Sequence, residues 1–126
     1  MVQCMKILEF CDLVLAVDKR IRYVGVYYNE NVYHKLQKNV QSHFTDEEDM
    51  ISVRTEVVRA SMRRYMVEKL GEPIFSITKY PKVTMVTFHF MMTNLVMLSI
   101  EPDVNPDDII NKVSDMIKTH GESLGP

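Results

Sequence analysis

The sequence predicts one α+β domain over residues 1–126: a five-stranded antiparallel sheet, with elements in the order α-β-β-α-β-β-β-α. Three observations lead to this fold class. Apolar residues switch between helical and strand spacing in that order along the chain. The last three strands follow one another with no helix between them, as antiparallel neighbours can. The predicted strands are largely apolar on both faces, so helices must cover both. We expect the long central helix on one face and the two terminal helices on the other.

The first predicted helix spans about residues 3–16. Its apolar residues recur at helical spacing, and Lys6, Glu9 and Asp12 lie on the opposite side. Cys4 and Cys11 would share one face of this helix, with Cα atoms about 10 Å apart, which is too far for a disulfide. We therefore expect two free, packed thiols of the kind found in cytoplasmic proteins.

A β-hairpin is expected next. The segments RIRYVGVYY (20–28) and VYHKLQ (32–37) alternate as strands do, and the polar residues NEN (29–31) between them signal a turn.

Residues 45–70 carry the clearest helix signals. Thr45 followed by Glu48 is a capping-box pattern, and the acidic residues after Thr45 suit the positive end of the helix dipole. Gly71 stands where a C-terminal glycine is expected, and Pro73 forbids continuation. The pattern predicts one helix of about seven turns.

Three strands follow the long helix. They are PIFSIT (73–78), KVTMVTFHF (82–90) and NLVMLSIE (94–101). The segments KYPK (79–82) and MMTN (91–94) fit the connecting turns, with Pro81 outside the ladders.

The last predicted helix covers NPDDIINKVSDMIKTH (105–120). Asn105 is the expected cap and Pro106 the first helical residue. The tail GESLGP (121–126) is expected to be loose, which leaves an ordered core of about residues 3–119.

Composition and motifs argue against several classes of function. A net charge of -2 and a pI near 6.1 give no general attraction to nucleic acid. Charged residues interrupt the N-terminal apolar segment, so we expect neither a signal peptide nor a membrane span. The four histidines lie in separate elements, and no GxxxxGK[ST] or GxGxxG motif is present. The sequence therefore predicts no metal, no cofactor, no catalytic residue, and no membrane or nucleic-acid partner.

The order of elements, the hairpin RIRYVGVYYNENVYHK (20–35) and the segment EPIFSITKY (72–80) resemble those of roadblock/LC7 domains, within the wider profilin-like group. Small archaeal proteins of unknown function are similar in shape. The resemblance covers about residues 3–119 and is topological. It implies a non-enzymatic dimer that scaffolds or regulates a partner protein, often a small GTPase. One departure is the segment KNVQSHF (38–44), which lacks the glycine-rich character of many such domains.

The long helix is the expected interface of a homodimer. Its apolar arc covers nearly half of the helical wheel, more than the roughly 100° that one packing contact needs. One part of the arc can pack on the sheet while another meets a second subunit, and the segment PIFSIT offers a strand edge beside it. A helix set deeply within a monomer is the alternative. The predicted interface residues are Val53, Val57, Ala60, Ser61, Arg64, Ile74 and Phe75.

The basic segment VRASMRRYMVEKLG (58–71) has three possible interpretations. A solvated face matched to the helix dipole is favoured, partner binding through Arg59 and Arg63 is second, and nucleic-acid contact is third. At the level of function, a small-ligand sensor with a pocket between sheet and helix is the alternative to the interaction module, and an enzyme ranks third.

Overall fold

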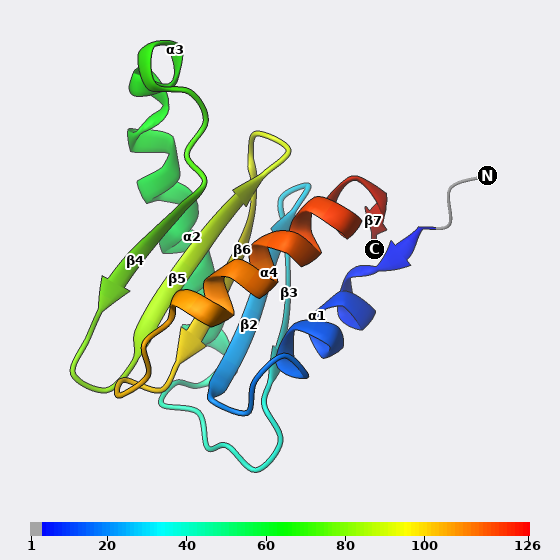
Figure 1. The fold of residues 1–126 in the computed structure, drawn as a ribbon, viewed down its shortest axis with the longest axis vertical. Helices are drawn as coiled ribbons and strands as arrows, with labels where there is room; N and C mark the ends of the chain where they lie inside the picture. The colour runs from blue at the N-terminus through cyan, green and yellow to red at the C-terminus, as the bar shows by residue number, and fades with distance from the viewer. Residues whose placement is uncertain (1–3) are drawn as a thin grey trace.

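A five-stranded antiparallel sheet forms the centre of the molecule, with strand order β3-β2-β6-β5-β4. The structure, a computed structural model, describes residues 4–126. Helices α1 and α4 cover one face of the sheet and helix α2 lies on the other (Figure 1), which confirms the predicted fold class. The elements of these three layers are α1 (Ile7–Leu15), β2 (Ile21–Tyr28), β3 (Asn31–Leu36), α2 (Asp46–Met62), β4 (Phe75–Lys79), β5 (Thr84–Phe90), β6 (Asn94–Ile100) and α4 (Asp107–His120).

The two faces of the sheet are covered unequally. The face under α1 and α4 holds a large apolar core, whose members include Ile7, Phe10, Val14, Val86, Phe88, Leu98, Ile109 and Val113. The face under α2 holds a small one, made of Tyr23, Val53, Met85 and Met97. Helix α2 buries only Asp49, Val53 and Glu56. It is therefore held by few core contacts, and most of its surface stays accessible.

Gly25 makes room for α2 on the sheet. A Cβ atom at Gly25 would lie 2.6 Å from Cγ2 of Val53, which is inside van der Waals contact. The missing side chain lets Val53 reach the strand, and this explains a glycine within a strand that is otherwise rich in valine and tyrosine.

The start of α2 is as predicted. The Glu48 N–H donates to Thr45 Oγ1 (3.2 Å), and the Thr45 N–H donates to Glu48 Oε1 (3.0 Å). The capping box is thus complete, and it satisfies backbone donors that the first turn of a helix leaves unpaired.

The prediction of one continuous helix from Thr45 to Leu70 is wrong in its second half. Helix α2 ends at Met62, a 3₁₀ turn follows at Arg64–Met66, and α3 (Val67–Leu70) completes the segment. The Met66 N–H donates to the Arg63 carbonyl (3.1 Å), the shorter repeat of a 3₁₀ turn. This end extends beyond the sheet (Figure 1) and buries none of its residues, so no core packing favours one unbroken α-helix. Gly71, with φ +86°, ends α3 as expected.

The C-terminal tail is ordered, contrary to prediction. After a 3₁₀ turn at Gly121–Ser123, strand β7 (Leu124–Gly125) pairs in parallel with β1 (Met5–Lys6). Leu124 is buried in the core beneath α1 and α4, and this burial holds the tail in place. The ordered core therefore extends to Gly125 and does not stop at residue 119.

Both terminal helices begin later than predicted. Helix α1 begins at Ile7, whereas the predicted start at residue 3 lies outside the described residues. Cys4 therefore precedes the helix and is exposed, and only Cys11 is the packed thiol that was expected. Burial raises the pKa of Cys11 to about 12, so this thiol stays protonated. Helix α4 begins at Asp107, whose N–H donates to Asn105 Oδ1 (3.0 Å).

Candidate interaction surface

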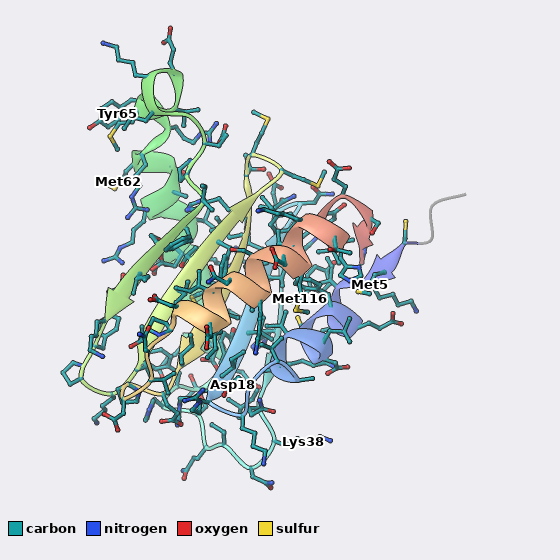
Figure 2. The ribbon with its side chains drawn as sticks, in the orientation of Figure 1. Met5, Asp18, Lys38, Met62, Tyr65 and Met116 are labelled. Atoms are coloured by element: carbon teal, nitrogen blue, oxygen red, sulfur yellow. The ribbon has the colours of Figure 1, made fainter. Side chains whose placement is uncertain are left out.

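Exposed apolar residues lie on the side of α2, and of the 3₁₀ turn after it, that faces away from the sheet, with the polar Arg54 and Thr55 between them. We call these apolar residues the outer stripe, which consists of Ile51, Val58, Met62 and Tyr65. Successive members of the stripe are seven, four and three positions apart, and residues with these spacings lie on one side of a helix. Met62 is 71% and Tyr65 82% exposed, and both side chains project away from the sheet in Figure 2. Large apolar side chains gathered on one exposed helix face mark a contact surface.

Strand β4 adds an open sheet edge. It pairs with β5 on one side, and no strand of residues 4–126 pairs with its other side. Ile74, Phe75 and Ile77 are all exposed along this segment. We call these three residues the edge patch. An apolar edge with unpaired backbone groups is a template for a further strand.

A hollow of about 610 Å³ lies beside the C-terminal half of α2. One wall is the helix side that carries Val57, Ala60, Ser61 and Arg64, and the other wall is formed by the β2–β3 and β5–β6 turns. The two turns are joined, because the Asn29 N–H donates to Asn94 Oδ1 (3.3 Å).

The β5–β6 turn is strained at its tip. Met91 and Met92 have φ angles of +46° and +67°, and both side chains are exposed. The left-handed conformation costs a non-glycine residue about 1–2 kcal/mol. Retaining two flexible, exposed methionines in such a conformation is typical of a surface that contacts other molecules.

The fold of the chain matches those of solved structures, whereas no protein-family model and no curated protein matches its sequence. Gliding protein MglB from Thermus thermophilus aligns over 91% of this chain and 88% of its own, with a TM-score of 0.64 and 10% identity. MglB of Myxococcus xanthus aligns over 92% of this chain and 94% of its own, with a TM-score of 0.66 and 15% identity. A structure described as MglB with tetrameric arrangement aligns over 93% of this chain and 89% of its own, with a TM-score of 0.65 and 10% identity.

The fold is roadblock/LC7-like. At these identities the likeness establishes the three-layer fold, and it confirms the resemblance that the order of elements indicated.

The roadblock-like structure separates the predicted interface residues into three groups. Val53 is fully buried against the sheet within one chain, so its placement in the interface is corrected. Val57, Ala60, Ser61 and Arg64 line the hollow beside α2. Ile74 and Phe75 are exposed at the β4 edge. The last two groups remain predictions.

The outer stripe is absent from those predicted interface residues. Its spacing on the wheel is visible in the sequence, but the buried side of α2 carries Asp49 and Glu56. Because carboxylates lie on the buried side and apolar residues on the exposed side, hydrophobicity alone does not show which side of the helix faces the sheet.

The two arginines predicted to bind a partner differ in their surroundings. Arg59 is held against the sheet, because its Nη1 donates to Glu56 Oε1 (3.3 Å) and Thr78 Oγ1 (3.2 Å). Arg63 makes no ion pair within residues 4–126. Burial, and then the charge of Arg63, lowers the pKa of His89, so its imidazole is neutral at neutral pH. Of the two, Arg63 offers the freer charge to a partner.

Arg64 is tied to the segment that follows the helices. Its guanidinium donates to both carboxylate oxygens of Glu72, with Nη2 2.8 Å from Oε1. These hydrogen bonds lower the pKa of Glu72. The pair fixes the strand entry at Ile74 relative to the C-terminal end of α2.

The surface carries no sign of a metal centre or a membrane span. Within residues 4–126, no three histidine, cysteine, aspartate or glutamate side chains are grouped to hold a metal ion. No helix of the same residues is long and apolar enough to cross a membrane.

Proposed function

We propose that this chain is a cytoplasmic, non-enzymatic interaction module that forms a homodimer through α2 and the β4 edge, and that the dimer scaffolds or regulates a small GTPase. The observation that carries the proposal is the outer stripe. Its four apolar side chains face away from the chain's own core. Burial of such a face in an association releases about 25 cal/mol per Å² of apolar surface.

Charge along α2 favours an antiparallel pair of helices. The first turn carries the exposed carboxylates of Asp46, Glu47 and Glu48, whereas Arg63, which makes no ion pair within residues 4–126, follows the last turn. A two-fold axis across the middle of the helix places each acidic end beside the basic end of the other copy. The same axis lays the outer stripe of one copy against that of its partner. Opposite charges at both ends then select this orientation over a parallel one.

The edge patch supports the same symmetric contact. Strand β4 follows α2 and α3 in the chain, and its open edge can pair antiparallel with its own copy across a two-fold axis. The solved structure described as MglB with tetrameric arrangement shares the fold of this chain. Its arrangement supports self-association as a property that this fold can have.

The identity of the partner as a small GTPase is the more specific part of the proposal. It rests on what the roadblock/LC7 resemblance implies, together with Arg63, which is partly exposed, and Met91 and Met92, which are exposed. A charge without an ion pair and adaptable apolar side chains both suit a protein surface.

A nucleotide-state binding assay tests this part. Small GTPases encoded by the same genome are purified, loaded with GDP or a non-hydrolysable GTP analogue, and titrated with the protein by calorimetry. We expect one of them to bind with a preference for one nucleotide state. Arg63→Glu is expected to weaken that binding roughly tenfold or more, since 1.4 kcal/mol corresponds to tenfold.

Lys38→Glu is the matched control for the arginine variant. It makes the same change of charge at an exposed lysine in the β3–α2 loop, far from the end that carries Tyr65 (Figure 2), and is expected to leave binding unchanged. If no GTPase binds at about 100 μM protein, roughly a hundred times a micromolar dissociation constant, the regulatory part of the proposal is wrong, whatever the oligomeric state.

A further inference from the structure

A second cavity, of about 680 Å³, lies beneath the N-terminal half of α2. The helix, the loop at residues 37–45, the β4–β5 turn and the sheet enclose it. Its wall is largely apolar, with contributions from Leu36, Phe44, Ile51, Tyr80, Val83 and Met85. Its volume is in the range of small-molecule sites, which are apolar cavities with a few placed polar groups.

Asp49 is the buried carboxylate in this cavity that has no cationic partner within residues 4–126. It is 7% exposed, and its hydrogen bond to Ser42 Oγ is long at 3.4 Å. No cation of residues 4–126 lies within ion-pair distance of it. Burial raises the pKa of Asp49, although nearby His34 opposes this effect. A buried carboxylate is costly unless it is paired.

The other ionic groups that line the cavity are satisfied or lie at its mouth. Glu56 is also buried, but it accepts hydrogen bonds from Arg59 and from the Thr87 hydroxyl (3.2 Å). Arg22 pairs with Glu101 (2.6 Å). Glu48 belongs to the capping box, and His43 and Lys82 are exposed. The group in the cavity that has no partner of opposite charge is therefore the carboxylate of Asp49.

The Tyr23 hydroxyl is a second unsatisfied group at this site. Tyr23 is 4% exposed, and its hydroxyl is buried without a hydrogen-bond partner within the described residues. Its ring lies beside that of His34, with centroids 5.7 Å apart. Solvent does not reach this hydroxyl, which lies 3.2 Å from the position that a Gly25 Cβ atom would take, so it is a polar defect beside the cavity and not a group open to a ligand. The group that a ligand can meet is the carboxylate of Asp49, because buried polar atoms are almost always hydrogen-bonded or paired.

We propose that this cavity binds a small molecule that carries a protonated amine on an apolar body. The ammonium group donates to Asp49, and the apolar body contacts the aliphatic and aromatic wall. An anionic ligand is disfavoured, because Arg22 and Arg59 already have carboxylate partners. Such a site extends the module beyond protein contacts.

Calorimetry with matched probes tests the site. The probes are 2-phenylethylamine, 2-phenylethanol and 3-phenylpropanoate, which share an apolar ring and differ in the polar end. The amine is expected to bind saturably and more tightly than the other two. Asp49→Asn is expected to weaken amine binding roughly tenfold to a hundredfold, as loss of a hydrogen bond to a charged group does.

Glu47→Gln is the control, because it removes an exposed carboxylate from the same turn of α2 and is expected to leave amine binding unchanged. Circular dichroism checks that each variant folds. If Asp49→Asn does not fold, the preference for amine over alcohol in the wild type decides the question. Equal binding of amine and alcohol, undiminished amine binding by Asp49→Asn, or no amine binding at millimolar concentration overturns the proposal. The same titration on a monomeric variant separates this result from the question of dimerisation.

Discussion

Val58→Asp is expected to convert the protein from a dimer into a folded monomer. Val58 lies at the middle of the outer stripe and is 60% exposed within one chain, so the substitution removes little from the chain's own core. In a symmetric contact the new carboxylate is buried twice near the axis, and an unpaired buried charge costs several kcal/mol. We therefore expect the dissociation constant to rise a hundredfold or more. Light scattering measures the mass, and circular dichroism measures the helix content.

Val58→Thr is the matched control, because it keeps the β-branched shape without adding a charge. It is expected to stay dimeric with at most a modest loss of affinity. A Val58→Asp variant that retains the wild-type mass would show that the outer stripe is not the interface.

Val53→Asp, five residues earlier on the same helix, is expected to destabilise the fold of the chain strongly. Val53 is fully buried, and it packs with Tyr23, Met85 and Met97 above Gly25. The substitution deletes core contacts and buries a carboxylate in the cluster formed with Tyr23, Met85 and Met97. Together these effects remove roughly 3–5 kcal/mol, a large part of the 5–15 kcal/mol that stabilises a typical domain.

Urea denaturation followed by circular dichroism measures this loss. Val53→Ala serves as the control, since it leaves a cavity but adds no charge, and it is expected to fold with a lower midpoint. A Val53→Asp variant that folds as well as the wild type would contradict the position of α2 on the sheet.

These two valines show where prediction from sequence ends. Both belong to the apolar arc of the predicted helix, yet one is in the core and the other faces solvent. The deciding partner of Val53 is Gly25, which is remote in sequence and whose missing side chain opens the sheet to the helix. The same face buries Glu56, which is satisfied by Arg59 and by Thr87 on β5. Contacts between distant segments therefore decide which side of α2 is buried.

Sequence signals that act within a single helical turn predicted the element boundaries correctly. The capping box at Thr45 and Glu48 and the positive φ at Gly71 are both local, and both were predicted. The break after Met62 was not, because it depends on where the sheet stops supporting the helix. The pairing of β7 with β1 was not predicted either, because it joins the two ends of the chain through a single buried leucine, Leu124.

The candidate site was predictable to a similar extent. The sequence pattern singled out the long helix, Ile74 and Phe75, and the fold leaves both Ile74 and Phe75 exposed; their contact with a second copy stays a prediction. The hollow that gathers Val57, Ala60, Ser61 and Arg64 opposite the hairpin turns depends on how those turns meet, which local spacing does not encode.

The mass of the wild-type chain in solution tests the central claim most directly. Light scattering coupled to size exclusion, over a dilution series from about 100 to 1 μM, covers the concentrations at which dimers of micromolar or better affinity are populated. If the outer stripe and the β4 edge join two copies, the mass is twice the 14.7 kDa of one chain at the upper concentrations. A mass of 14.7 kDa across the whole series would contradict the proposed dimer.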